Sequence, residues 1–303
     1  KIIFNINLNN SCCSEKKYWP DPFITEMEPN QPHRMFLPLI NRGTYTRIYA
    51  INTYVRKILD TQPKTDNINI ILLGSGFDTL YFNLVTEGHK NISFYEFDYD
   101  KITTKKNQLI NSSNKLKEVI NGHNGGKFYH IIPCDITKIE KLNKKIDENI
   151  PKDRRNDLTI IICECLLVYI EREITMNILS KFFSIFKNSV FLEYDLIGAN
   201  DGFGREMIMN LSQRGIQLKG FDGVPTMKEQ IERVKELGYE QVEFVDLKKI
   251  YNCFLAPEER RRVDRLEMMD EFEEFDLLQT HACFGYGIHV EEHGKHLPQP
   301  KSE

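Results

Sequence analysis

An apolar run that ends in a glycine turn constrains the fold of this chain more than any other feature. Residues 68–73 have the length and composition of a buried strand, and Gly74-Ser75-Gly76 follows directly. Residues 79–85 are then amphipathic. A strand that leads through a Gly-x-Gly turn into a helix brings backbone close to a ligand, because no side chain intervenes. We therefore expect a strand-turn-helix unit whose turn contacts a ligand.

The rest of the chain repeats the alternation of strand and helix. Six further apolar runs are typical of strands, namely residues 92–98, 128–132, 158–165, 189–196, 241–247 and 277–290. Helical spacing separates several of them, most clearly at 173–186 and 226–237, and it returns within 257–274. The polar stretch 101–126 predicts one helix and then a surface loop. Strands that alternate with helices predict a parallel sheet with helices on both faces.

Composition excludes several classes of protein. The 303 residues carry a formal net charge of −4, which is not the basic footprint of a nucleic-acid-binding domain. The seven cysteines match no disulfide framework, and so we expect a reducing compartment, the cytoplasm. No apolar stretch approaches the ~18 residues that span a bilayer, and the N-terminal residues do not resemble a signal peptide. The histidines and cysteines show no metal-ligand spacing, so no metal is expected.

Two acids near the end of the second strand indicate a nucleoside ligand. Asp98 lies 22 residues past Gly76, where an acid accepts two hydrogen bonds from a ribose diol. Glu96 shares its face of the strand and is the second choice. Thr79 stands where a dinucleotide fingerprint has its third glycine, which disfavours a pyrophosphate-bridged ligand. The alternative is a structural turn with ordinary surface acids.

Acids after the third and fourth strands extend this expectation. Asp135 could reach the exocyclic amine of an adenine while Ile136 covers the ring, although Asp135 could equally cap a helix. Glu164 lies at the end of an apolar strand, where a carboxylate is costly to bury without a partner. We favour a role for Glu164 at the ligand's amino group or at the reacting centre over a solvated strand end.

Longer motifs resemble the leucine carboxyl methyltransferase family. They occur in order over roughly residues 18–290 and are YWPDPF (18–23), NRGTYTR (41–47), GSGFDTLYFNL (74–84), YEFD (95–98), ECLLVYI (164–170), GFGREMIMNL (202–211) and LEMMDEFEE (266–274). The resemblance implies an α/β fold of the class I S-adenosylmethionine-dependent methyltransferases, a mostly parallel seven-stranded sheet with an antiparallel last strand. It implies one domain over 1–303, with an N-terminal helical cap at 1–60 and a lid insertion at 197–225.

The activity that the resemblance implies is methylation of a protein C-terminus. The substrate would be the α-carboxylate of the C-terminal leucine of the type 2A protein phosphatase catalytic subunit. S-adenosylmethionine would donate the methyl group and leave as S-adenosylhomocysteine. We expect a cytoplasmic monomer that needs neither metal nor nucleic acid.

The resemblance also assigns residues to the cofactor and the substrate. Those that would bind the cofactor are Arg47 at the methionine carboxylate, Gly74 in the turn, Asp98 at the ribose, Asp135 and Ile136 around the adenine, and Glu164 after the fourth strand. Arg42 or Arg47, together with Tyr169, is expected to hold the substrate carboxylate, the alternative for Tyr169 being a packed aromatic. Family members carry a lysine upstream of the Tyr-Trp pair that we cannot place, because Lys16 and Lys17 lie too close to Tyr18.

Three other functions are compatible with these sequence features. They are methylation of a modified guanosine in the transfer-RNA wybutosine pathway, methylation of a small-molecule oxygen, and non-catalytic binding of S-adenosylmethionine or of the phosphatase. The acidic net charge favours a protein over RNA as substrate. Turnover on a phosphatase tail would separate the enzyme from the binding protein.

Overall fold

A seven-stranded sheet forms the centre of the computed structural model, which describes residues 2–28 and 36–291, without the side chains of residues 2–8. The strand order is β3-β2-β1-β4-β5-β7-β6. The strands are β1 (Ile68–Leu73), β2 (Ile92–Asp98), β3 (Tyr129–Pro133), β4 (Leu158–Glu164), β5 (Asn188–Leu196), β6 (Gln241–Asp246) and β7 (Ala282–Val290). β1 to β5 are parallel, and β7 is antiparallel to both β5 and β6. The expected fold class is confirmed.

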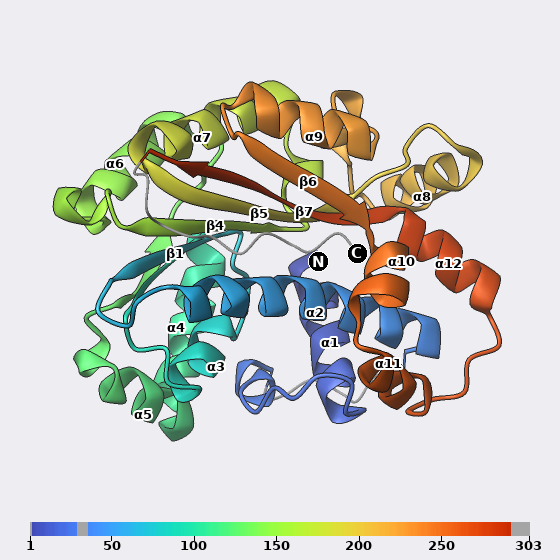
Figure 1. Ribbon diagram of the computed structural model, residues 1–303, viewed down its shortest axis with the longest axis horizontal. Coiled ribbons are helices and arrows are strands. Elements are labelled where there is room, and N and C mark those ends of the chain that lie inside the picture. The colour runs from blue at the N-terminus through green and yellow to red at the C-terminus, as the bar shows by residue number, and fades with distance from the viewer. Residues whose placement is uncertain (1, 29–35, 292–303) are drawn as a thin grey trace.

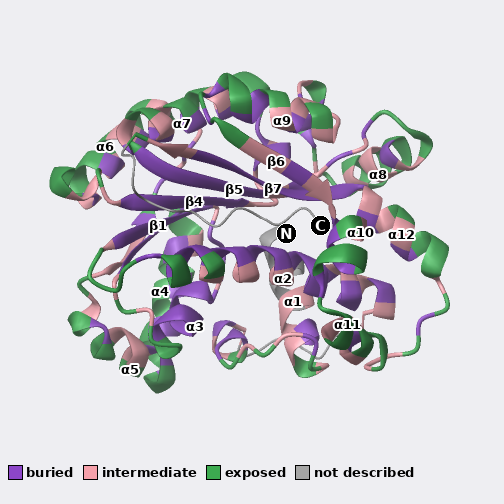
Figure 2. Ribbon diagram, in the orientation of Figure 1, coloured by how far each residue is buried: buried purple, intermediate pink, exposed green. Residues whose placement is uncertain are grey.

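The inner strands are apolar because both of their faces are covered. All six residues of β1 are buried, as are all seven of β2, and Figure 2 shows the central strands coloured almost entirely as buried. In parallel strands, side chains alternate between two helix-covered faces, so a continuous apolar run is required. Two separate hydrophobic cores follow, one on each side of the sheet.

Two layers of helices enclose the sheet (Figure 1). One face is covered by α6 (Ile139–Asn149), α7 (Arg172–Ile185) and α9 (Met227–Glu236). The other face is covered by α2 (Pro38–Thr61), α3 (Leu80–Thr86), α4 (Asp100–Ser112) and α5 (Asn114–Gly122). The parallel strands therefore end at a common edge, with a helical layer on each side of it.

Two segments outside the sheet contribute further helices: one precedes β1 and the other follows β5. Within residues 1–60, the described elements are α1 (Ile2–Glu15), the 3-10 turn η1 (Ile24–Met27) and the 24-residue helix α2, which begins with Pro38 at its first turn. Residues 1 and 29–35 lie outside the described residues. Segment 197–225, which follows β5, contains α8 (Gly202–Gln213) and the turn η5 (Lys219–Asp222).

Close packing fixes the start of α8. Asp201 caps the helix by accepting a hydrogen bond from the Gly204 N–H at 2.8 Å, and its other oxygen lies 2.8 Å from His281 Nε2. A Cβ at Gly204 would lie 1.9 Å from the carbonyl oxygen of Gly198. Only glycine allows the helix to approach the preceding loop this closely.

Three expectations about local structure are corrected. Residues 277–280 belong to α12 (Phe272–Thr280), and the last strand begins at Ala282. Stretch 101–126 contains a second helix, α5, and the 3-10 turn η2 (Asn124–Gly126), where a loop was expected. The helical pattern over 257–274 is interrupted after α11 (Pro257–Asp264), since the Asp264 and Glu267 carbonyls accept hydrogen bonds from the Arg42 side chain.

Short elements complete the chain. They are the 3-10 turns η3 (Lys152–Arg154) and η4 (Leu167–Tyr169), the single turn α10 (Leu247–Lys249) and the π-helical turn η6 (Ile250–Phe254). None of the helices in the described part of the chain combines the length and the apolar composition that a membrane span requires.

Candidate active site

A cavity of about 550 Å³ opens where β1, β2, β3 and β4 end. A volume of several hundred Å³ suits a small-molecule ligand, and this edge of an open α/β sheet is where such ligands bind. Segments that follow all four strands line it, together with α1 and η5. The main lining residues are Asn10, Gly74, Gly76, Asp78, Asp98, Cys134, Ile136, Lys138, Glu164, Cys165, Tyr169 and Lys219.

The glycine turn after β1 forms one wall of the cavity. Gly74 and Gly76 have φ values of 70° and 53°, which residues with a Cβ rarely adopt. A Cβ at Gly74 would also lie 2.8 Å from Leu166 Cδ1 on the opposite side. The turn is tied to β2, because Gly74 N–H donates to the Phe97 carbonyl at 2.8 Å. Backbone atoms therefore face the cavity in a fixed position.

Asp98 lies on the cavity wall and anchors the same turn. Its carboxylate accepts hydrogen bonds from Gly76 N–H at 2.7 Å and from Tyr99 N–H at 2.6 Å. Burial raises the pKa of Asp98, and these two N–H groups oppose that rise. A carboxylate has about four lone-pair sites, so acceptor capacity remains for a diol. The geometry suits the ribose role expected for Asp98.

Glu96, the second choice for the ribose, does not line the cavity. It is fully buried behind the wall, where Lys106 Nζ lies 2.5 Å from one oxygen and the Tyr129 hydroxyl donates to the other at 3.0 Å. Lys106 also donates to the Asp78 carbonyl at 2.8 Å. Of the two acids on this face of β2, Glu96 therefore belongs to a buried ion pair and Asp98 to the ligand cavity.

Arg47 of α2 is linked to the cavity through Asn10 and Glu164, and Glu164 ends β4, which β1 separates from the Asp98 strand β2. Its Nε lies 2.8 Å from Glu164 Oε1, and its Nη2 donates to Asn10 Oδ1. Burial, the largest single effect, would lower the pKa of this guanidinium, but the Glu164 carboxylate together with Tyr194, Cys165 and Cys13 more than offsets it, and the pKa is raised. Arg47 itself is not on the cavity wall, whereas Asn10 and Glu164 are. This ion pair makes the part of the cavity wall near Glu164 charged and able to form hydrogen bonds.

The residues after β3 divide between the cavity and a turn. Ile136 lines the cavity, as an apolar cover for a ring would. The Asp135 carboxylate instead accepts the Thr137 N–H at 3.1 Å and the Thr137 hydroxyl at 2.6 Å. Asp135 does not line the main cavity but lines a neighbouring depression. Its side chain therefore stabilises the turn before α6.

Arg42 and Tyr169, expected to hold the substrate, have different surroundings. Arg42 is buried away from the cavity, where its guanidinium contacts the Asp264 carboxylate at 3.1 Å and donates to the carbonyls of Asp264 and Glu267. The structure thus gives Arg42 a role in joining α2 to α11. Tyr169 does line the cavity, with its hydroxyl 3.6 Å from Cys165 Sγ.

Sequence reasoning missed several residues of the cavity, among them one amide and one acid. Among the described side chains of α1, Asn10 reaches the wall, whereas Lys16, which follows the helix, lies 3.2 Å from Glu267 instead. Asp78, two residues after the second glycine of the turn, is the other. The position of Asp78 in the glycine motif could have indicated its role. The role of Asn10 could not be predicted from sequence, because the position of Asn10 depends on how α1 packs on α2. Among the described residues, no group of three His, Cys, Asp or Glu side chains could hold a metal ion.

Comparison with known proteins agrees with this geometry. Residues 12–183 match the leucine carboxyl methyltransferase family. Leucine carboxyl methyltransferase 1 homolog of Arabidopsis thaliana is 31% identical over 290 residues, which cover 91% of this chain and 84% of that protein. Leucine carboxyl methyltransferase 1 of Caenorhabditis elegans is 32% identical over 292 residues, which cover 89% of this chain and 85% of that protein.

A solved structure supports the fold independently. A methyltransferase candidate from Thermobifida fusca superposes with a TM-score of 0.55 at 13% identity, covering 84% of each chain. At that identity the likeness concerns the fold alone. The family match extends over more than half of the chain, and relatives above 30% identity span most of it. The chain therefore belongs to the leucine carboxyl methyltransferase family and is a methyltransferase.

Proposed function

We propose that this protein transfers a methyl group from S-adenosylmethionine to the α-carboxylate of a protein's C-terminal leucine. The family resemblance makes the tail of the type 2A phosphatase catalytic subunit the proposed substrate. One observation carries the proposal: a single cavity is lined both by Asp98 at the end of β2, an acid suited to a ribose, and by Glu164 at the end of β4, which pairs with Arg47. These two positions, with β1 between them, match the nucleoside and the amino-acid halves of the donor.

The wall residues fit the groups of the donor one by one. Asp98 would accept from the ribose hydroxyls, and Ile136 would cover the adenine. Gly74 leaves space that a Cβ would fill, so the donor can lie against backbone. Arg47 lies off the cavity wall, where two of its five N–H donors contact Glu164 and Asn10, so its remaining donors would have to reach past these two residues to bind the methionine carboxylate. Asp135 would act only through the turn that it stabilises.

For this reaction the protein must align the reacting atoms and exclude water, and it needs no general base. When bound, the donor supplies an electrophilic methyl group on a sulfonium. The substrate carboxylate is already ionised at neutral pH, since its pKa is about 3.3–3.7. Charge disappears as the methyl group is transferred, so a cavity that excludes water favours the reaction. Holding the reacting atoms in line can contribute roughly 7–11 kcal/mol.

Tyr169 and the segment after β5 are the proposed contacts for the substrate. Tyr169 lines the cavity, and its hydroxyl would donate a hydrogen bond to an entering carboxylate. Segment 197–225 adds Lys219 to the wall, and its helix α8 stands beside the same edge of the sheet (Figure 1). We assign this segment as the lid and as part of the surface that meets the phosphatase, with residues 1–60 forming the cap.

The state of the cysteines supports a reducing location. All seven are free thiols, and five of them are buried. Free thiols persist in reducing compartments, so we place the protein in the cytoplasm.

Peptides that differ only at the C-terminus test the function. We expect transfer of labelled methyl groups to a peptide that ends in a free leucine carboxylate, and none to the same peptide ending in an amide. Equal labelling of both would contradict carboxylate methylation. Binding of the donor without transfer to peptide or whole phosphatase would favour the non-catalytic alternative.

A further inference from the structure

Asp78 stands where the main cavity meets a second, smaller one. The small cavity has a volume of about 30 Å³ and shares Asn10, Leu72, Asp78 and Glu164 with the main cavity. Its size admits only one or two water-sized groups. The rest of its lining includes the polar side chains of Asp21, Asn52 and Asn83. The junction is thus a narrow polar recess at the end of the ligand cavity where Glu164 lies.

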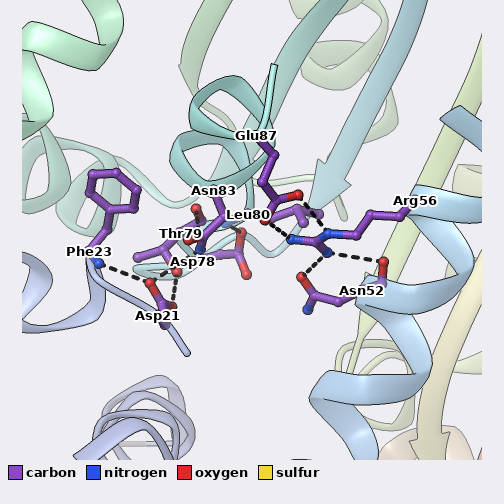
Figure 3. A network of polar contacts seen from close by, with 9 residues as sticks. All are labelled: Asp21, Phe23, Asn52, Arg56, Asp78, Thr79, Leu80, Asn83 and Glu87. Carbon is purple, nitrogen blue, oxygen red and sulfur yellow. Dashed lines mark hydrogen bonds and ion pairs between the residues drawn. The ribbon is translucent and has the colours of Figure 1, made fainter. Parts of the chain in front are cut away.

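No cation in the described part of the chain contacts the Asp78 carboxylate. Its Oδ1 accepts the Leu80 N–H at 2.8 Å. The nearby cations are engaged elsewhere: Lys106 of α4 pairs with Glu96, and Arg56 of α2 pairs with Glu87 and Asn52, as Figure 3 shows for Arg56. The closest cationic contact is made by Lys106 with the Asp78 main-chain carbonyl.

The acids around Asp78 make its charge unfavourable. Glu164 of β4 and Glu96 of β2 both repel a negative charge there. The neighbouring Asp21 carboxylate is occupied by the Thr79 hydroxyl, the Asn83 amide and the Phe23 N–H (Figure 3). Burial raises the pKa of Asp78 to about 7, with Lys106 and the Leu80 N–H opposing the rise. The recess therefore lacks a positive group that an ionised Asp78 would need.

We propose that Asp78 binds the ammonium group of the methyl donor and gives up its proton to solvent as the donor enters. This inference rests on the proposed function for the identity of the donor. The methionine end of the donor carries a carboxylate, an ammonium and a sulfonium, and so has a net positive charge. Arg47 and Glu164 already neutralise each other at 2.8 Å. An ionised Asp78 gives this end of the cavity the complementary net negative charge.

The expected signature is donor binding that tightens as pH rises. A carboxyl that titrates near 7 is about a tenth ionised at pH 6.0 and about three quarters ionised at pH 7.5, so affinity should rise roughly 10-fold over that interval. The donor's own amine titrates near 7.7–8.0, so the comparison stops below that range. The difference between wild type and a variant of Asp78 isolates the contribution of this residue.

Isothermal titration of S-adenosylmethionine into the full-length protein tests the proposal. It would be performed at about pH 6.0 and 7.5, each in two buffers that differ in ionisation enthalpy, with wild type, Asp78→Asn and Asp21→Asn. An asparagine at position 78 retains an oxygen for the Leu80 N–H. Asp21→Asn is the matched control, because Asp21 borders only the small cavity and is already fully engaged.

Wild type should bind roughly 10-fold more tightly at the higher pH and release a fraction of one proton. Asp78→Asn should bind more weakly than wild type at both pH values, with the larger deficit at pH 7.5, change less than about twofold with pH, and release fewer protons. Asp21→Asn should keep the wild-type pH dependence. Identical pH dependence in wild type and Asp78→Asn would overturn the role of Asp78, as would an affinity of Asp78→Asn at pH 7.5 equal to that of wild type. Failure of wild type to bind the donor at all would instead refute the proposed function.

Discussion

The buried pair of Lys106 and Glu96 provides a prediction whose size follows from the structure. Neither side chain has any exposed surface, and Nζ lies 2.5 Å from the carboxylate. Lys106→Met removes the cation and leaves Glu96 buried without an opposite charge. Breaking such a pair from one side costs about 3–5 kcal/mol, and the lost bond to the Asp78 carbonyl adds about 1 kcal/mol. Domains of this kind are stable by only about 5–15 kcal/mol.

Urea denaturation followed by circular dichroism measures this loss. The double variant Glu96→Gln/Lys106→Met removes both charges and keeps an acceptor for the Tyr129 hydroxyl, so at least half of the lost stability should return. A loss below about 1 kcal/mol for Lys106→Met, or equal losses for the single and the double variant, would refute the reasoning.

The penalty should also depend on pH in a defined direction. Burial raises the pKa of Glu96 even with Lys106 present, and the variant lacks the charge that opposes the rise. A raised folded-state pKa means that the folded protein binds the proton more tightly than the unfolded chain. The cost of Lys106→Met should therefore be full above the folded-state pKa and shrink as the pH falls towards the unfolded value of about 4.3.

Two further variants test the site and the lid. Arg47→Ala should weaken binding of S-adenosylmethionine by roughly 10- to 100-fold in calorimetry, because a charge-assisted hydrogen bond contributes about 1.5–3 kcal/mol; unchanged affinity would remove Arg47 from the donor site. Asp201→Ala should destabilise α8 by about 1 kcal/mol and speed hydrogen exchange in that helix. The Gly204 N–H and His281 lower the pKa of Asp201. The stabilisation that Asp201 provides is therefore present above the unfolded-state pKa of about 3.9 and is lost as the pH falls. A destabilisation by Asp201→Ala that persists in acid would contradict this account.

The sheet and the glycine turn were predictable because local sequence determines them. A strand buried on both faces must be apolar throughout, and the bounds of β1 and β2 matched the apolar runs. Gly74 needs a positive φ and space for close approach, so its residue type is itself the signal. Asp98 followed from its distance to the turn along one βα unit. These features depend on neighbours in sequence or in the adjacent strand.

Most of the features that the sequence did not predict depend on packing between distant segments. Arg42 and Arg47 lie on one helix with similar surroundings in sequence, and only the position of α11 decides that Arg42 joins an ion pair away from the cavity. Asn10 reaches the cavity because α1 packs on α2. The error at residues 277–280 has a local origin, since only the three polar residues 279–281 separate the apolar pair Leu277-Leu278 of α12 from the apolar run of β7. Periodicity alone cannot separate a helix end from a strand start in such a run.

Transfer of labelled methyl groups to the whole phosphatase tests the central claim most directly. The type 2A catalytic subunit and the same subunit without its last leucine would be incubated with this protein and radiolabelled S-adenosylmethionine. We expect label on the full-length subunit only, released by mild alkali as from a methyl ester. Label on both subunits, or on neither despite measured donor binding, would contradict methylation of the C-terminal leucine.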